Sequence, residues 1–164
     1  MAVSIHAVTP DFVAEIGDVA LNKVSSDDLA TIREAFTKYA VLVFPDQEFD
    51  DDGQLAFARH FGPLETTVFM ARKGHNLRLH QNMADVGNLD AENRILETNN
   101  RQRLYNLGNR LWHTDSSFKR LPAYCSMLHA RSIPPIGGHT EFADMRAAYD
   151  ALDARTKAEI EDLI

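Results

Sequence analysis

Cysteine is almost absent from this sequence of 164 residues, in which Cys125 is the only one. One thiol cannot form an internal disulfide, and such a composition is typical of proteins that work in a reducing cytoplasm. Basic residues are also outnumbered, with 17 Lys and Arg against 24 Asp and Glu and a net charge of −7. Because binding to nucleic acid needs clustered positive charge, we expect no nucleic-acid partner.

Long apolar runs, signal peptides and internal repeats are missing as well. The longest uninterrupted apolar stretch, from Tyr39 to Phe44, falls far short of the roughly 18 residues that a membrane span needs. The N-terminus has neither the basic start nor the apolar core of a signal peptide. We therefore expect a cytoplasmic protein without a membrane partner, and we find no linker that would divide residues 1–164 into domains.

The first third of the chain carries two helix signals and one strand signal. Ser25 is placed to cap a helix that runs to about Lys38. Both faces of the segment Ala40 to Phe44 are apolar, which predicts a fully buried strand. A second helix is predicted from Asp51 to His60, and Gly62-Pro63 ends it.

The remainder of the sequence is irregular first and mixed afterwards. Residues 66–107 are polar and irregular, and long ordered loops of this kind are often functional. Beyond them, Tyr124 to Ala130 and Thr140 to Ala143 have the composition of short strands. Asp144 is placed to cap a helix through Leu152, and a helical pattern continues to the last residue. Periodicity alone therefore predicts a mixed α and β protein.

His113 and Asp115 stand two positions apart in the segment Leu111 to Phe118. In an extended backbone residues i and i+2 project from the same face, so an imidazole nitrogen and a carboxylate oxygen can converge on one metal ion. With a second histidine from elsewhere, this pair would make the facial triad of Fe(II) oxygenases. The tripeptide alone is weak evidence, because a His-x-Asp is expected by chance in a chain of this composition. A surface histidine bonded to a nearby aspartate is the alternative.

Four ordered stretches of the sequence resemble the taurine dioxygenase and 2,4-dichlorophenoxyacetate dioxygenase family. They follow the family order and are spread along most of the chain: Ala40 to Gln47, Leu55 to Glu65, Leu111 to Phe118 and Pro134 to Leu152. The last stretch is the most specific, and it is most similar to the branch that cleaves phenoxyalkanoate herbicides. These neighbours strengthen the interpretation of the His-x-Asp pair.

The resemblance implies Fe(II) as the metal, 2-oxoglutarate and O₂ as cosubstrates, and His113 and Asp115 as metal ligands and catalytic residues. It implies that Thr140 hydrogen-bonds a carboxylate of 2-oxoglutarate, although threonine also suits a short strand by propensity alone. Asn109 matches a position that lines the substrate pocket, and the alternative is a loop asparagine bonded to its own backbone. The expected fold is mixed α/β and mainly β. It is a double-stranded β-helix (jelly roll) with flanking helices, incomplete in this chain.

Members of this family are nearly twice as long as this chain. Their later half supplies the distal histidine of the triad and the arginine that pairs with the far carboxylate of 2-oxoglutarate. We therefore expect residues 1–164 to be the N-terminal portion of a single dioxygenase domain. Because bidentate Arg–carboxylate pairing is a main source of cosubstrate affinity, we expect this piece alone to be inactive. A homo-oligomer of the full-length enzyme is compatible with the resemblance.

The implied substrate is a small organic anion, first of all an aryloxyalkanoate, whose hydroxylation beside the ether oxygen leads to ether cleavage. Taurine, or another alkylsulfonate or sulfate, is the alternative substrate. An anion favours cations near the pocket, and a solvated loop face is the alternative role for each basic residue of the irregular middle. These residues are Arg72, Lys73, Arg78, Arg94, Arg101 and Arg103.

Two other functions stay open on the residues alone. A zinc hydrolase could use His113 and Asp115 with His129 or His139, since catalytic zinc often takes two histidines and a carboxylate. A binding module that keeps the fold without catalysis is the other. We expect His139 at a turn or surface position, His129 packed or hydrogen-bonded in a strand, and Trp112 in the core beside His113 and Asp115.

Overall fold

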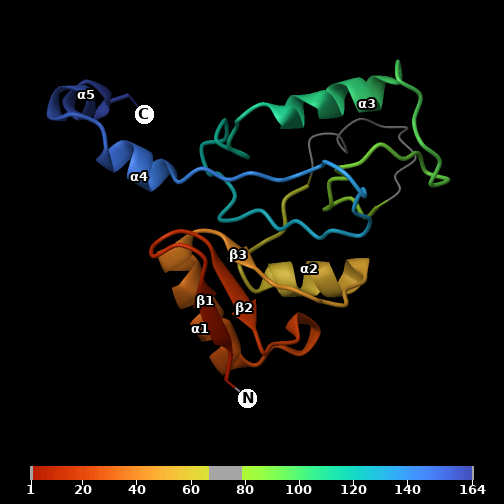
Figure 1. The fold of residues 1–164 in the computed structure, drawn as a ribbon, viewed down its shortest axis with the longest axis horizontal. Helices are drawn as coiled ribbons and strands as arrows, with labels where there is room; N and C mark the ends of the chain where they lie inside the picture. The colour runs from red at the N-terminus through yellow and green to blue at the C-terminus, as the bar shows by residue number, and fades with distance from the viewer. Residues whose placement is uncertain (1, 67–78, 164) are drawn as a thin grey trace. The chain divides into compact units, whose positions relative to one another are not determined.

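The computed structural model describes residues 2–66 and 79–163 and divides the chain into two compact units (Figure 1). Unit 1 comprises residues 1–47 and 130–164, and unit 2 comprises residues 48–129. Helices and strands both occur, so the mixed α and β composition is confirmed. In the described part of the chain, no helix combines the length and the apolar character needed to cross a membrane.

Unit 1 begins with a three-stranded sheet in the order β1-β2-β3. The strands are β1 (Ser4–Ala7), β2 (Ala14–Gly17) and β3 (Leu42–Val43). Strands β1 and β2 are antiparallel, with Ile5 opposite Ile16, whereas β3 runs parallel to β2. Alternation along β2 buries Ala14 and Ile16 and exposes Glu15, so one face of the sheet belongs to the core.

Helix α1 (Ser26–Tyr39) contacts β2 and β3 and completes this core (Figure 1). The Oγ atom of Ser25 accepts a hydrogen bond from the main-chain N–H of Asp28 at 3.1 Å, which confirms the predicted cap. Ile32 is completely removed from solvent. The helix ends before Ala40, whose φ of +60° turns the chain toward β3.

The strand predicted from Ala40 to Phe44 is shorter and less buried than expected. Only Leu42 and Val43 pair with β2, and Val43 is 45% exposed. An apolar composition favours burial of a strand, but full burial also requires other elements to pack on both faces of the strand. Among the described residues α1 is the helix that contacts β3, and β3 is the last strand in the order. The prediction of full burial is therefore wrong for this segment.

Gln47 ties the end of β3 to the 3₁₀ turn η1 (Leu21–Lys23). Its Nε2 donates to the carbonyl oxygens of Val19 at 3.1 Å and Pro45 at 3.0 Å. Its Oε1 accepts from the main-chain N–H of Leu21 at 3.0 Å. One side chain thus pairs three main-chain groups of two loops, and unpaired main-chain groups are costly near a core.

The last helices of the chain are α4 (Met145–Asp150) and α5 (Ala154–Ile160). The carboxylate of Asp144 accepts from the main-chain N–H of Arg146 at 2.9 Å, which confirms the predicted cap of α4. That of Asp153 accepts from Thr156 at 2.8 Å and caps α5. The helix predicted through Leu152 ends two residues earlier than expected.

Unit 2 begins with helix α2 (Asp51–Arg59), which confirms the predicted helix to within one residue. Asp50 caps it by accepting from the main-chain N–H of Gly53 at 2.7 Å. The buried ring of Phe57 lies among other aromatic rings, with centroid distances of 6.1 Å to Phe49 and 5.5 Å to Phe61. These rings form the apolar centre of unit 2.

Residues 79–110 are irregular, as predicted, but they contain one helix that the sequence did not reveal. Helix α3 (Arg101–Asn106) leads into the 3₁₀ turn η3 (Leu107–Arg110). Before it, Oδ1 of Asp90 accepts from the main-chain N–H groups of Glu92 and Arg94, each at 2.9 Å. This loop therefore satisfies polar groups locally, and an isolated antiparallel bridge between Leu89 and Ile95 closes it.

The strands predicted from Tyr124 to Ala130 and from Thr140 to Ala143 are not formed in the described part of the chain. The segment Leu111 to Phe118 also lacks strand pairing. Strand propensity expresses how well a segment fits beside another strand, and no described strand pairs with these segments. The predominance of β structure expected from the resemblance is thus not found among the described residues.

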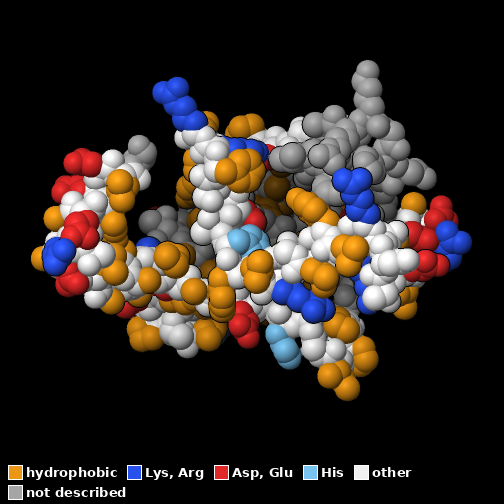
Figure 2. All heavy atoms as spheres, turned by 90° about the horizontal axis from the view of Figure 1, so that it is seen from above, with side chains coloured by type: hydrophobic (Ala, Val, Ile, Leu, Met, Phe, Trp, Pro, Cys, Tyr) orange, Lys and Arg blue, Asp and Glu red, His pale blue; other side chains and the backbone are white. Residues whose placement is uncertain are grey.

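Burial is distributed unevenly along the chain. Every buried apolar residue of the described ranges lies between Ala14 and Leu96. Later apolar side chains are exposed instead, including Trp112 at 69% and Ile136 at 92%. Figure 2 shows hydrophobic side chains, in orange, on the face in view. The prediction that Trp112 is a core residue is wrong, because no described element covers it.

Candidate metal centre

His113 and Asp115 lie close together in unit 2, with one nitrogen and one oxygen turned toward each other. The Nε2 atom of His113 is 3.5 Å from Oδ1 of Asp115. Both side chains are accessible, with relative exposures of 49% for His113 and 61% for Asp115. The two groups therefore approach a common point although their segment is not a paired strand.

The other ring nitrogen of His113 is engaged by the backbone. Nδ1 lies 2.7 Å from the carbonyl oxygen of Leu111. A carbonyl oxygen only accepts, so Nδ1 carries the hydrogen and donates it. The lone pair of the neutral imidazole is then on Nε2, the nitrogen that faces Asp115. Histidines that bind metals commonly have this arrangement, in which the second nitrogen donates to a carbonyl or carboxylate.

The second oxygen of Asp115 is engaged as well. Its Oδ2 accepts a hydrogen bond from Oγ of Ser126 at 2.8 Å. First-row metal ions bind imidazole nitrogen and carboxylate oxygen at about 2.1 Å, so two ligands of one ion lie at most about 4.2 Å apart. The separation of 3.5 Å between Nε2 and Oδ1 satisfies this limit. The pair thus fits two coordination positions of one divalent ion.

A third protein ligand is not found within residues 2–66 and 79–163, where no group of three His, Cys, Asp or Glu could hold a metal ion. His129, a candidate in the zinc alternative, has a buried Nδ1 without a described hydrogen-bond partner. Its ring lies edge-on to Phe49, with centroids 5.9 Å apart, so it is packed as predicted. His139, the other candidate, is exposed, as predicted. The described residues therefore provide no third ligand for a zinc hydrolase.

The turn that follows Asp115 is held by Glu65. Ser116 has a φ of +59°, an uncommon conformation for a residue other than glycine. Oε2 of Glu65 accepts from Oγ of Ser116 at 3.1 Å and from Nζ of Lys119 at 2.6 Å. The hydrogen bond from Lys119 lowers the pKa of Glu65 from its ordinary value, and the bond from Ser116 acts in the same direction. The Glu65 carboxylate thus joins the side chains of Ser116 and Lys119, which follow Asp115 in the sequence.

Thr140, the predicted contact to 2-oxoglutarate, belongs to unit 1. It is exposed and lies in a segment without strand pairing. Within the described part of the chain its hydroxyl forms no hydrogen bond, so the hydroxyl is available to a ligand. Asp144, four residues later, caps α4: its side chain accepts hydrogen bonds from the main-chain N–H groups of Arg146 and Ala147.

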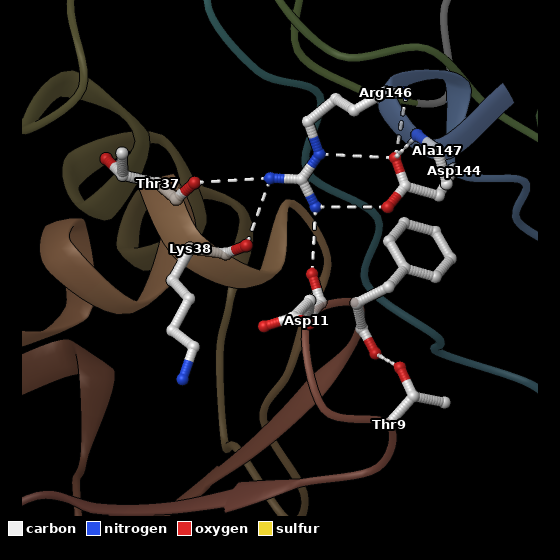
Figure 3. Close-up of polar contacts among 8 residues, drawn as sticks. Thr9, Asp11, Thr37, Lys38, Asp144, Arg146 and Ala147 are labelled. Atoms are coloured by element: carbon white, nitrogen blue, oxygen red, sulfur yellow. Dashed lines mark hydrogen bonds and ion pairs between the residues drawn. The ribbon is translucent and has the colours of Figure 1, made fainter. Parts of the chain in front are cut away.

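Arg146 ties this end of the segment to the N-terminal part of unit 1 (Figure 3). Its Nη1 donates to the carbonyl oxygens of Lys38 at 3.0 Å and Thr37 at 3.4 Å, at the end of α1. Its Nη2 donates to the carbonyl oxygen of Asp11 at 2.9 Å. Both oxygens of Asp144 accept from the same guanidinium, which lowers the pKa of Asp144 and raises that of Arg146.

Asn109 is exposed in η3, four residues before His113 and in the same unit.

Of the basic residues considered for an anionic substrate, Arg72, Lys73 and Arg78 lie outside the described residues. Hydrogen bonding and ion pairing with Asp90 raise the pKa of Arg94, which is held within its own loop. Nη1 of Arg103 donates to the carbonyl oxygen of Leu96 at 3.0 Å. Arg94 and Arg103 therefore stabilise loop structure, while Arg101 is exposed at the start of α3.

Sequence reasoning did not single out Ser126, Glu65 or Arg146. Glu65 and Arg146 stand in stretches that carry the family resemblance, and this was the available signal. Ser126 meets Asp115 from 11 positions away, and no local pattern encodes such a contact. Its place in a strand-like segment is the sole hint that the sequence offers.

The sequence has recognisable relatives among known proteins. The family model described as taurine catabolism dioxygenase TauD, TfdA family matches residues 4–164. An alpha-ketoglutarate-dependent 2,4-dichlorophenoxyacetate dioxygenase of Cupriavidus pinatubonensis is 38% identical over 164 residues, covering 99% of this chain and 57% of the relative. An (S)-phenoxypropionate/alpha-ketoglutarate-dioxygenase of Sphingobium herbicidovorans is 36% identical over 164 residues, covering 99% of this chain and 52% of the relative.

A solved structure shares the fold. The crystal structure of AAD-2 in complex with Mn(II) and N-oxalylglycine has a TM-score of 0.84 and 45% sequence identity. The match covers 99% of this chain and 54% of that chain. The chain thus spans about half the length of the relatives that it matches.

Proposed function

We propose that this chain, which belongs to the taurine catabolism dioxygenase TauD, TfdA family, supplies two metal ligands and one cosubstrate contact to an Fe(II)- and 2-oxoglutarate-dependent dioxygenase. The observation that carries the proposal is the separation of 3.5 Å between Nε2 of His113 and Oδ1 of Asp115. The remaining polar atoms of both side chains are bonded to Leu111 and Ser126, and Nε2 and Oδ1, which face each other, are the atoms that we propose for the ion.

The substrate that we propose is an aryloxyalkanoate, a small organic anion that would be hydroxylated beside its ether oxygen. Relatives that act on 2,4-dichlorophenoxyacetate and on (S)-phenoxypropionate, at 38% and 36% identity, support this choice. An alpha-ketoglutarate-dependent sulfonate dioxygenase of Saccharomyces cerevisiae is 28% identical over 156 residues. Aryloxyalkanoates therefore fit better than taurine or another sulfonate.

Each residue has a distinct task in this proposal. When bound, iron would supply the oxidation of an unactivated C–H bond with O₂ and 2-oxoglutarate. His113 contributes a neutral nitrogen and Asp115 a carboxylate oxygen, so the pair brings one negative charge to a divalent cation. The hydroxyl of Thr140 donates to a carboxylate of 2-oxoglutarate, and Asn109 lines the substrate pocket.

The proposal extends to the parts that these 164 residues do not provide. The third ligand, a histidine, and the arginine that pairs with the far carboxylate of the cosubstrate would come from polypeptide outside them. We propose that both units belong to one double-stranded β-helix domain, in keeping with a family match that runs from residue 4 to residue 164. The exposed apolar side chains beyond Leu96 support a fold that further polypeptide covers. The single cysteine favours a cytoplasmic location.

Ligand variants of the protein that carries this chain test the proposal. We expect His113→Ala and Asp115→Ala to lose bound iron and 2-oxoglutarate-dependent O₂ uptake, because each removes one of three protein ligands. His139→Ala, an exposed histidine without a role here, serves as the control and should keep both. Full iron content and O₂ uptake in Asp115→Ala would overturn the proposal.

Two further measurements separate the competing functions. Release of a phenol from 2,4-dichlorophenoxyacetate, with no release of sulfite from taurine, would identify the aryloxyalkanoate substrate. A binding module would instead retain no 2-oxoglutarate-dependent activity with either compound. The 164-residue polypeptide by itself is expected to bind iron weakly and to turn nothing over, and 2-oxoglutarate decarboxylation by this piece would contradict that expectation.

A further inference from the structure

The carboxylate of Asp115 is held by a neighbour on the side away from His113. Oδ1 faces Nε2 of His113, while Oδ2 accepts a hydrogen bond of 2.8 Å from Oγ of Ser126. An ionised carboxylate only accepts, so the serine hydroxyl is the donor. The two oxygens of one side chain are thus assigned to different partners.

Ser126 lies on a defined face of its segment. From Ala123 to His129 exposure alternates residue by residue, which is the pattern of an extended backbone. Ser126 falls on the more exposed face, and Cys125 and His129 on the less exposed one. His129 lies edge-on to Phe49, and burial raises the pKa of the Cys125 thiol. The packed face anchors the segment within unit 2, and Ser126 is presented to Asp115 from the opposite face.

The hydrogen bond matters because the side chain of Asp115 is largely exposed. Its side chain is 61% exposed, and a solvated carboxylate turns freely about its terminal torsion. A carboxylate that turns can bind an ion through either oxygen or through both. A donor fixed on Oδ2 stops this rotation and leaves Oδ1 as the oxygen that meets the ion. Partners of this kind orient metal ligands and contribute to metal affinity.

We propose that Ser126 is a positioning residue that holds Asp115 for binding of the metal ion through the single oxygen Oδ1. The inference rests on the proposed role of Asp115 as a metal ligand. It deepens that role by naming the residue that sets the coordination mode. Ser126 itself does not touch the ion.

Ser126→Thr and Ser126→Val in the protein that carries this chain test the inference as a matched pair. The two side chains have nearly the same shape, and only threonine keeps the hydroxyl. The metal-free variants should therefore melt at the same temperature, which checks that folding is unaffected. Mn(II) affinity is measured by the electron paramagnetic resonance signal of free Mn(II), and coordination is followed by the visible absorption of bound Co(II).

We expect Ser126→Val to bind Mn(II) about 10- to 100-fold more weakly than Ser126→Thr, the range typical for loss of a partner to a metal ligand. Its Co(II) absorption should shift as the carboxylate changes its coordination mode. Ser117→Ala removes an exposed hydroxyl two residues from Asp115 that has no hydrogen bond among the described residues, and it should change neither readout.

Two negative results have different meanings. Equal Mn(II) affinity and equal Co(II) spectra in the threonine and valine variants would overturn the role of Ser126, provided that Asp115→Ala has lost its metal. Retention of Mn(II) affinity in Asp115→Ala would overturn the assignment of Asp115 as a ligand, and the role of Ser126 with it.

Discussion

Arg146 donates a hydrogen bond of 3.0 Å to the main-chain carbonyl of Lys38, which lies 108 positions earlier in the sequence. That carbonyl belongs to the C-terminal end of α1, where helix carbonyls lack intrahelical partners and carry partial negative charge. A guanidinium suits this position, because its planar set of donors also reaches Asp11 and Asp144. One exposed side chain therefore links the beginning and the end of unit 1.

We expect Arg146→Met to lower the melting temperature of the protein, because it removes every one of these bonds and leaves Asp144 without its cation. Arg146→Lys should recover only part of the loss, since a single ammonium cannot replace a planar fork. Arg155→Met is the matched control. It removes an arginine from a surface pair with Glu159 at 2.9 Å on α5, and surface pairs contribute little. A decrease in melting temperature as large for Arg155→Met as for Arg146→Met would contradict the prediction.

The lowered pKa of Glu65 predicts a pH dependence with a definite sign. Its ordinary value is 4.5, and the hydrogen bond from Lys119 holds the folded-state value below that. The stabilisation by the charged carboxylate is therefore complete at pH values above 4.5 and is lost as the pH falls through the lower folded-state value. Urea unfolding midpoints of the parent protein and of Glu65→Gln should accordingly converge below pH 4.5.

Lys119→Met is the control for this titration. Removing the cation takes away the main cause of the lowered pKa of Glu65. The loss of stability on acidification should therefore be smaller in Lys119→Met than in the parent protein. A difference in urea unfolding midpoint between the parent protein and Glu65→Gln that stays constant with pH would contradict the prediction.

Two glutamines of similar chemistry are expected to respond oppositely to replacement by methionine. Gln47 pairs three main-chain groups, so Gln47→Met should lower the free energy of unfolding by about 1–3 kcal/mol. Gln54 has a buried Oε1 with no hydrogen-bond partner among the described residues. Gln54→Met therefore relieves an unpaired acceptor and should raise stability by about 1 kcal/mol. Chemical denaturation measures both, and an equal loss in the two variants would refute the contrast.

The proposed contact of Thr140 predicts a specific kinetic change. Thr140→Val keeps the shape of the side chain and removes the hydroxyl. A hydrogen bond to a charged group contributes about 1.5–3 kcal/mol, so the KM for 2-oxoglutarate should rise roughly 10- to 100-fold. The KM for the organic substrate should stay near its parent value, and Thr140→Ser should retain most of the cosubstrate affinity. A change in the KM for the organic substrate alone would contradict the assignment.

Helices were predictable from this sequence because their ends are encoded locally. Ser25 and Asp144 each cap a helix within three residues of themselves, and both caps were read correctly. The proximity of His113 and Asp115 was predictable for the same reason, since two positions are enough to bring both side chains close together. Their role as metal ligands remains a prediction, as do the roles of Thr140 and Asn109, which rest on the resemblance.

Strands and side-chain partners were harder, because both depend on residues far away in the sequence. The segment Thr140 to Ala143 has strand composition but no paired neighbour among the described residues. Trp112 has core character, yet it is 69% exposed because nothing described packs on it. Ser126 and Arg146 find partners 11 and up to 135 positions away, which no local pattern encodes.

Among the described residues, the buried apolar side chains of both units lie between Ala14 and Leu96, and this has a consequence for biosynthesis. The ribosome releases the N-terminal part first, at roughly 5–20 residues per second, and domains begin to fold as they emerge. These buried residues are therefore all present in the nascent chain several seconds before residue 164 is added. His113 and Asp115, the proposed metal ligands, are synthesised after these buried residues.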